Sequence, residues 1–389
     1  MRLTETTTSE ALRRKVCSLG CLTSGPNSRE AAMTRIIRGT ARSIGRRATC
    51  ICMSALFALV TASVSAQTGG MQRPINIEVI DLGLPGTFTV RISDRGLVFG
   101  VDSAGLNFVL DTRTGRYQGS LPPPTIEPFD INKRGEVVGL YDTPSSIQGG
   151  LWTWENGRQL SPSFLPRGIN EHGDMAGNCI LAGQAGPPCL LTRDPQDDLA
   201  SGMLRVIDVG VDTAQLVGIN DHGVVVGNAS YPDGSTRAFT WSPTDGVTFL
   251  DTPPSMNSVA TAINDHGQIA GAIQGETVSH ATMWFAGSGA IGAELTALNS
   301  FALAINDHGV LLVLDLTGPF GYHVWVPSRD IVAALPPADP TASGVIATDI
   351  NDRGEIIGMQ YVASPDGVVL SSQLIMWEIG IRGAHLQVR

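Results

Sequence analysis

Three charged residues stand at the same place in a repeated motif and are the strongest candidates for chemistry in this sequence. Arg91, Asp130 and Asp349 each come directly before the isoleucine of an Ile-polar-x-x-Gly motif, where the other four copies have Gly or Ala. Two carboxylates at a set separation can act as acid and base in glycoside hydrolysis. Two carboxylates around an arginine can equally form a buried ion-pair triad that only stabilises the fold. We favour the structural triad and keep a polar notch for a small ligand as the alternative.

The elements that must position these residues follow from the repeat itself. Each copy of the motif is followed by an apolar stretch, a turn, an aromatic strand and a fourth short apolar segment. Four short strands per unit at this period are typical of a β-propeller blade. The motif occurs seven times, separated by 38 to 50 residues, at 92–96, 131–135, 169–173, 219–223, 263–267, 305–309 and 350–354.

The two ends of the repeat region predict how the ring closes. Residues 76–83 resemble the closing strand of the third unit at 204–210, whereas the seventh unit finishes near Trp377 without such a strand. We therefore expect an all-β propeller of seven four-stranded blades in which the N-terminal strand completes the last blade and leaves no open edge. A tail strand at 384–388 competes for the same place. Closure would make blades seven, one and two consecutive and would bring Asp349, Arg91 and Asp130 to one side of the channel.

The aromatic strands raise the question of whether tryptophans pack the blades or bind ligands. Because they recur at one repeat position, we expect packing between blades rather than a platform for sugars. Trp152 lies two residues before the repeat tryptophan Trp154, and alternation along a strand puts both on one face. The tryptophans assigned to the repeat position are Trp154, Trp241, Trp284, Trp325 and Trp377.

The unit as a whole is similar to a known repeat. It reads Ala-x-x-Ile-Asn-x-x-Gly-x-Val-x-Gly followed by aromatic-x-Trp, with fragments of a His-Ala-Phe-Leu-Trp strand at 237–241 and 280–284. This resembles the HAF repeat of bacterial extracellular proteins over residues 76–378. The resemblance implies a secreted or surface propeller and carries over no catalytic residues.

The turns themselves have a backbone explanation. Asn at the second position can form an Asx turn, and Gly at the fifth accepts a positive φ. Equivalent positions on neighbouring blades lie on a wide circle, too far apart to surround one metal ion. We therefore expect no metal and no cofactor at the four turn histidines, which are His172, His222, His266 and His308.

The N-terminal region predicts export. An arginine-rich stretch precedes the apolar run 51–60 and the small residues Val64-Ser65-Ala66, as in a cleaved secretory signal. The apolar run is too short to span a bilayer, so we expect no stable membrane insertion after cleavage, with an uncleaved anchor as the alternative. The expected layout is an over-extended start at 1–32, a signal peptide at 33–66, a linker at 67–75, the propeller at 76–378 and a tail at 379–389.

Export to the periplasm or the medium fits the rest of the composition. Only Cys179 and Cys189 lie beyond residue 66, and an oxidising compartment would let them form a disulfide. Without residues 1–66 the chain has 16 basic and 33 acidic residues, a net charge of −17, which disfavours nucleic acid as a partner.

These observations predict a monomeric, non-enzymatic binding module whose partner is a protein or a polysaccharide. The alternatives are a propeller enzyme acting on a glycan, with Asp130 and Asp349 as acid and base, and a purely structural repeat protein. No catalytic residue is assigned.

Overall fold

The computed structural model describes residues 75–86, 90–102, 105–121, 126–142, 147–153, 157–161, 163–181, 184–193, 202–211, 213–317, 321–365 and 368–381. The expected start, signal peptide and tail strand lie outside these residues. Among the described residues no helix has the length and apolar character needed to cross a membrane.

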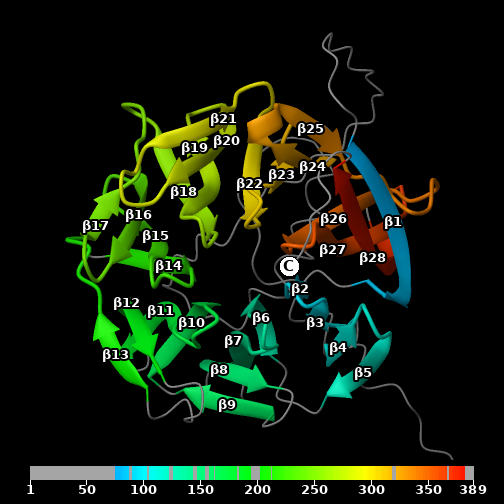
Figure 1. The fold of residues 1–389 in the computed structure, drawn as a ribbon, viewed down its shortest axis with the longest axis horizontal. Coiled ribbons are helices and arrows are strands. Elements are labelled where there is room, and N and C mark those ends of the chain that lie inside the picture. Colours follow the sequence, from blue (N-terminus) through cyan, green and yellow to red (C-terminus); the bar gives the residue numbers. More distant parts are fainter. Residues whose placement is uncertain are drawn as a thin grey trace, which may run out of the picture. The chain divides into compact units, whose positions relative to one another are not determined.

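The described strands form seven four-stranded antiparallel sheets arranged as blades in a ring (Figure 1), and the innermost strands line a central channel. The seven-bladed β-propeller predicted from the repeat is therefore confirmed. In each of the first three blades the strands follow chain order from the channel outwards. These strands are β2 (Val90–Ile92), β3 (Leu97–Val101), β4 (Asn107–Asp111) and β5 (Arg116–Leu121) in blade 1; β6 (Ile126–Ile131), β7 (Val137–Asp142), β8 (Ile147–Thr153) and β9 (Gly157–Ser161) in blade 2; and β10 (Phe164–Ile169), β11 (Met175–Leu181), β12 (Gln184–Thr192) and β13 (Met203–Val206) in blade 3.

Blades 4 to 6 keep this order, and blade 6 adds a short 3-10 helix before its last strand. The strands are β14 (Thr213–Ile219), β15 (Val225–Ser230), β16 (Thr236–Ser242) and β17 (Gly246–Phe249) in blade 4; β18 (Asn257–Ile263), β19 (Gln268–Gln274), β20 (Ser279–Phe285) and β21 (Ile291–Leu295) in blade 5; and β22 (Ser300–Ile305), β23 (Leu311–Asp315), β24 (Gly321–Val326), the helix η3 (Pro327–Arg329) and β25 (Ile331–Ala334) in blade 6.

Blade 7 is built from both ends of the propeller. It comprises β26 (Gly344–Ile350), β27 (Glu355–Ala363), β28 (Val369–Ile381) and, as its outermost strand, β1 (Ile75–Pro85). The closure predicted from residues 76–83 is confirmed, with Ile77 opposite Ile379. The paired strands begin at residue 75 and end at residue 381, so they extend one residue before and three residues beyond the expected limits of 76 and 378.

The turn after each innermost strand shows why the motif needs Asn and Gly. In blade 4, Oδ1 of Asn220 accepts hydrogen bonds from the backbone N–H groups of His222 (3.1 Å) and Val224 (3.0 Å). Gly223 has a φ of +72°. Glycine adopts this conformation readily, whereas any residue with a Cβ atom would be strained there. The motif therefore fixes the chain reversal at the channel mouth.

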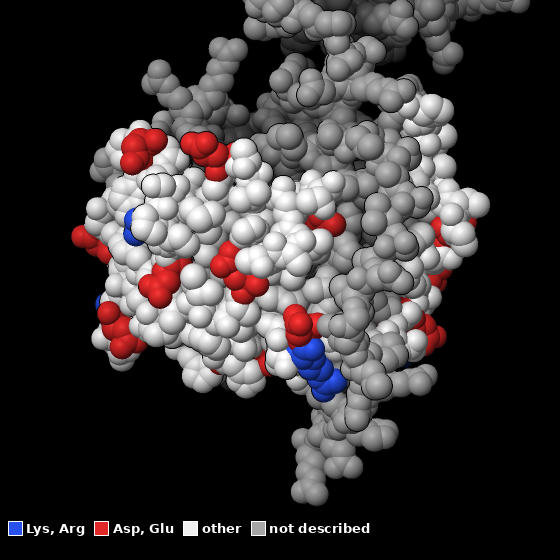
Figure 2. Space-filling model, turned by 90° about the horizontal axis from the view of Figure 1, so that it is seen from above, with Lys and Arg blue, Asp and Glu red and all other residues white. Residues whose placement is uncertain are grey.

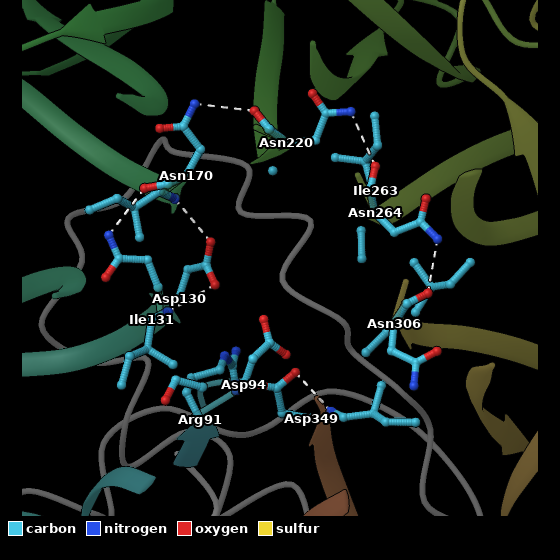
Figure 3. Close-up of a pocket in the computed structure, with 18 of the residues that line it drawn as sticks. Arg91, Asp94, Asp130, Ile131, Asn170, Asn220, Ile263, Asn264, Asn306 and Asp349 are labelled. Carbon is cyan, nitrogen blue, oxygen red and sulfur yellow. Dashed lines mark hydrogen bonds between the residues drawn. The ribbon is translucent and has the colours of Figure 1, made fainter. Parts of the chain in front are cut away.

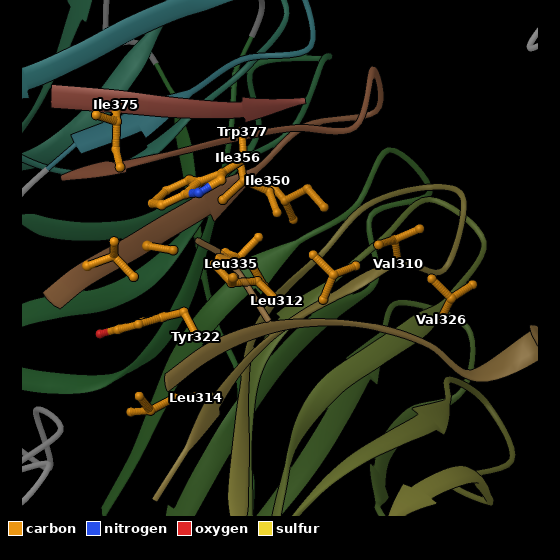
Figure 4. Close-up of a cluster of buried hydrophobic side chains, with 14 of the residues drawn as sticks. Val310, Leu312, Leu314, Tyr322, Val326, Leu335, Ile350, Ile356, Ile375 and Trp377 are labelled. Atoms are coloured by element: carbon orange, nitrogen blue, oxygen red, sulfur yellow. The ribbon is translucent and has the colours of Figure 1, made fainter. Parts of the chain in front are cut away.

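The hydrophobic core lies between adjacent blades. Where blades 6 and 7 meet, Leu312 and Tyr322 pack with Ile356 and Trp377 (Figure 4). Trp377 is fully buried, and its indole Nε1 donates a 2.7 Å hydrogen bond to the carbonyl oxygen of Pro336. A repeat tryptophan thus packs one blade against the preceding one.

The strand register corrects the assignment in blade 2. Trp152 lies opposite Val137, as Trp241 lies opposite Val225 in blade 4. Trp152 therefore occupies the repeat position that the sequence assigned to Trp154, and Trp154 lies outside the described residues.

Candidate functional site in the central channel

The channel forms a cavity of about 240 Å³ lined by the innermost strands and their turns. On one side the position before the repeat isoleucine is small, as at Gly218 and Ala262. On the other side Arg91, Asp130 and Asp349 project from the wall (Figure 3). The structure thus places the three predicted residues in one sector of the channel, on blades 1, 2 and 7.

The contacts of Arg91 differ from the expected ion-pair triad. Its Nε donates a 2.7 Å hydrogen bond to the carbonyl oxygen of Phe129 in blade 2, and Nη1 donates to the carbonyl oxygen of Val90 at 3.0 Å. No ion pair joins Arg91 to either aspartate in the part of the chain that the structure describes. The triad is therefore wrong as a set of direct contacts, because a backbone carbonyl at the blade boundary takes the guanidinium.

The two aspartates join consecutive blades through backbone amides. Asp130 accepts hydrogen bonds from Ile131 (2.8 Å) and from Ile169 of blade 3 (2.9 Å). Asp349 accepts from Ile350 (2.9 Å) and from Ile92 of blade 1 (3.1 Å). An innermost strand is a sheet edge, so its channel-side N–H groups need partners from outside the sheet. Each carboxylate supplies one partner to its own blade and one to the next.

The protonation of both aspartates responds to this enclosure. Burial and, to a lesser extent, the nearby charge of Asp349 raise the pKa of Asp130, whereas the hydrogen bond from Ile169 and the charge of Arg91 lower it, and the net value is about 6. Burial likewise raises the pKa of Asp349 to about 6 against the lowering effect of Arg91. Arg91 therefore acts on the carboxylates through its charge at a distance.

A ring of charged side chains at the channel mouth was not predicted from the sequence. In several turns the backbone N–H two residues after the isoleucine donates to the carboxylate at the same position of the next blade. The backbone N–H of Asp221 donates to Oδ1 of Asp265, and the backbone N–H of Asp265 donates to Oδ1 of Asp307, each at 2.8 Å. The sequence pattern that could have predicted this ring is the presence of six acidic residues and one lysine at a single repeat position. They are Asp94, Lys133, Glu171, Asp221, Asp265, Asp307 and Asp352.

Lys133 is the one cation in this ring. Its Nζ lies 3.4 Å from Oδ2 of Asp94 and 3.7 Å from Oδ2 of Asp352. Burial lowers the pKa of Lys133, but the nearby carboxylates, led by Asp94 and Asp352, more than compensate, so the pKa is raised. Burial, followed by the charges of Asp94 and Asp307, raises the pKa of Asp352 to about 7.

The turn asparagines form a second ring beneath the charged one. Each side-chain Nδ2 donates to the carbonyl oxygen of the residue at the same position in the next blade, which is asparagine in every case except Ser93, as from Asn220 to Asn264 at 3.1 Å (Figure 3). Sequence reasoning explained these asparagines by their own turns and missed the bond between blades. Blade 1 has Ser93 in place of asparagine, so the serine side chain cannot donate an equivalent amide hydrogen bond. The donors are Asn132, Asn170, Asn220, Asn264, Asn306 and Asn351.

Sequence reasoning also missed the residues two positions before the isoleucine. The pairing of each innermost strand in blades 2 to 7 shifts at this residue, as in a β-bulge, and the residue lines the channel. Two of them interact, because Cζ of Arg167 lies 4.0 Å from the centre of the Phe129 ring. This cation–π pair adds an aromatic face to the sector that contains Arg91 and Asp130.

The remaining candidates lie away from the channel axis. Cys179 in β11 and Cys189 in β12 form a disulfide with a Cα–Cα distance of 5.6 Å. The four turn histidines lie on four different blades. Within the described ranges no group of three or more His, Cys, Asp or Glu side chains is placed to hold a metal ion.

Comparison with known proteins supports the architecture. No family model and no curated protein matches the sequence. The β-propeller domain of Myceliophthora thermophila Cps50 (Swd1) is similar in structure, with a TM-score of 0.50 at 8% identity over 78% of this chain and 100% of that one. The β-propeller domain of the trilobed protease from Pyrococcus furiosus has a TM-score of 0.50 at 9% identity, over 76% of this chain and 95% of that one.

The acylaminoacyl peptidase of Pyrococcus horikoshii also has a TM-score of 0.50, at 10% identity over 77% of this chain and 52% of that one. At such identities the likeness shows the fold alone. The trilobed protease domain is described as having an open velcro topology, whereas here β1 closes blade 7 on β28.

Proposed function

We propose that this protein is an exported, non-enzymatic binding module that takes a protein or polysaccharide ligand at the channel mouth bearing the turns. The proposal rests on the hydrogen bonding of Asp130 and Asp349. Both oxygens of each carboxylate accept backbone hydrogen bonds. A general acid or base needs an oxygen within reach of the substrate proton, so these groups are better suited to holding the blades in place.

The mouth has the properties of a rigid display surface. Its turns are linked by the asparagine ring and the charged ring, so side chains there lose little conformational freedom on binding. The export signal and the resemblance to HAF repeats support a location in the periplasm or outside the cell. The net charge of −17 beyond residue 66 argues against nucleic acid.

One observation favours a second function, a propeller enzyme acting on a glycan. The pKa values of Asp130 and Asp349 are both raised to about 6, and a raised carboxyl pKa is typical of a catalytic acid. This reading requires one of the two carboxylates to release a backbone hydrogen bond during the reaction.

A single assay separates the two functions. The full chain is expressed, purified and mixed with peptidoglycan, neutral and acidic insoluble polysaccharides and envelope fractions. Both depletion of the protein from solution and release of soluble product are measured. Retention without product supports a binding module. Product release that is lost in Asp130→Asn or Asp349→Asn would establish the enzyme instead, and failure to bind any of these materials would remove the polysaccharide as ligand.

A further inference from the structure

A second cavity of about 240 Å³ lies where blades 1 and 2 meet, beside the channel mouth. Its lining includes one acid, Asp111, which pairs with Arg113 at 3.5 Å, and five cations, which are Arg95, Arg113, Arg116, Lys133 and Arg134. They belong to a chain with only 16 basic residues beyond residue 66, and the side of the propeller in Figure 2 has scattered acidic side chains and few basic ones. The seam between blades 1 and 2 is therefore a basic site on an acidic protein.

Arg95 is the lining residue whose charge is not neutralised locally. Three turns have arginine at this position, and in blades 2 and 7 an acid two residues later pairs with it. Arg134 pairs with Glu136 at 2.6 Å, and Arg353 pairs with Glu355. In blade 1 the residue two positions later is Leu97. Arg95 is exposed and forms no ion pair with any described residue.

The apolar lining of the cavity includes Trp152, the one described repeat tryptophan that is not buried. Trp241 and Trp377 are 6% and 0% exposed, whereas Trp152 is half-buried and lines the cavity. Its ring centroid lies 5.0 Å from that of the fully buried Phe99, with the two ring planes tilted by 54°. A flat aromatic surface packed against the core suits the apolar face of a ring.

The same seam is where both rings at the channel mouth depart from the repeat. Ser93 replaces the asparagine of blade 1, and Lys133 replaces the acid of blade 2. Lys133 lines both the channel and the seam cavity. The ring symmetry is therefore broken at the boundary that carries the five cations and the half-buried Trp152.

We propose that this seam pocket binds a carboxylated sugar ring, such as a uronic acid residue of an acidic polysaccharide. The guanidinium of Arg95 pairs with the carboxylate in the fork geometry that arginine favours, and Trp152 lies against the sugar face. The cavity is smaller than the ~300 Å³ at which pockets for drug-sized ligands begin, so it suits one ring with the rest of the polymer in solvent. The acidic ring next to it disfavours densely charged polyanions. The inference rests on the proposed binding function and names its ligand class.

The test is calorimetric titration of the full purified chain with a galacturonic acid trisaccharide, using a galactose trisaccharide as the neutral probe. We expect binding of the acidic sugar alone, weakened at least about tenfold by Arg95→His and by Trp152→Leu, since each removes one contact. Both substitutions use residues that the fold already accepts at these places. Histidine occupies the turn position in blades 3 to 6, and Leu110 occupies the tryptophan position in blade 1.

Arg237→His, an exposed arginine of β16 outside the pocket, is the matched control and should leave the affinity unchanged. Thermal unfolding monitors folding, and Arg95→Gln and Trp152→Phe replace any variant that does not fold. Equal binding of the neutral sugar, or unchanged affinity in both pocket variants, would overturn the inference. Tighter binding of a Glu-rich peptide with the same dependence on Arg95 would also overturn the assignment to a sugar.

Retention of the parent protein and of the pocket variants on the polysaccharide panel distinguishes failure of this inference from failure of the proposed function. If the parent protein and the pocket variants are retained equally, the seam pocket is not the ligand site and the binding function stands. If the parent is not retained on any polysaccharide, the polysaccharide arm of the proposed function fails together with this inference.

Discussion

The side-chain Nδ2 of Asn351 in blade 7 donates a 3.0 Å hydrogen bond to the carbonyl oxygen of Ser93 in blade 1, 258 residues earlier in the chain. The first and last blades are therefore joined beside the axis as well as at the periphery, where β1 completes blade 7. The two connections lie at the opposite edges of the blade 7 sheet, at β26 and at β1. The ring of blades is therefore closed both next to the channel, by the Asn351–Ser93 hydrogen bond, and at the outer edge, by the pairing of β1 with β28.

The asparagine ring can be tested apart from the turns it sits in. Asn220→Asp keeps the acceptor oxygen that organises its own turn but removes the Nδ2 donor to Asn264. We expect the free energy of unfolding to fall by about 1–3 kcal/mol, because a buried carbonyl loses its partner. Urea denaturation measures the change, with exposed Asp233→Asn as control. An unchanged midpoint would show that the bond between blades adds nothing to stability.

Arg91→Ala should destabilise the protein in a pH-dependent way. The substitution removes the hydrogen bond to Phe129 and the positive charge that lowers the pKa of Asp130 and Asp349. We expect a loss of about 1–2 kcal/mol at pH 7, where the carboxylates are ionised, and a smaller loss at pH 4, where they are protonated. Denaturant titrations at the two pH values measure both. Equal losses would mean that the charge of Arg91 does not act on the aspartates.

The raised aspartate pKa values set the direction of a pH effect on stability. Both aspartates hold their protons up to a pH of about 6 in the folded state, but only to about 4 when unfolded. Their contribution to stability is therefore complete below pH 4 and is lost as the pH rises through 6 towards 7.

The double variant Asp130→Asn/Asp349→Asn should lack this part of the dependence. We expect the unfolding free energy of the parent, relative to the variant, to fall by on the order of 4–5 kcal/mol between pH 4 and pH 7, because two pKa values are each raised from about 4 to about 6. Stability curves measured across this range test it. Parallel curves for parent and variant would contradict the prediction.

The disulfide should contribute measurably to the third blade. Cys179 and Cys189 are ten residues apart, and closing a loop of that size in the unfolded chain corresponds to about 2–3 kcal/mol. The double variant Cys179→Ser/Cys189→Ser should lose this amount in denaturant titration. Reduction with dithiothreitol should destabilise the parent alike and leave the variant unaffected.

Two tryptophans at the same repeat position should differ in their effect on stability. Trp377→Leu removes a fully buried side chain and its hydrogen bond to Pro336, so we expect a loss of about 3–5 kcal/mol. Trp152→Leu changes a half-buried side chain at the seam cavity and should cost about 1 kcal/mol. Equal losses in thermal unfolding would show that Trp152 is as much a core residue as Trp377.

The repeat by itself determined the number of blades and the way the ring closes. Each unit carries its own turn chemistry at Asn and Gly and its own strand periodicity, and these are local properties that a sequence pattern records. The likeness of residues 76–83 to a closing strand placed β1 in blade 7 for the same reason. The order of blades around the ring then followed from topology, which brought Arg91, Asp130 and Asp349 to one sector.

Tertiary structure alone decided what these side chains contact. The sequence did not show that Arg91 meets the carbonyl oxygen of Phe129, because that contact depends on the distance between two blades and on which polar groups an innermost strand leaves unpaired. The register of the aromatic strand in blade 2 was also decided by the tertiary structure. Trp152 and Trp154 share a face by strand alternation, and only the pairing of Trp152 with Val137 identifies the repeat position. Local pattern specifies the blade, whereas the spacing between blades determines which polar and aromatic groups come into contact.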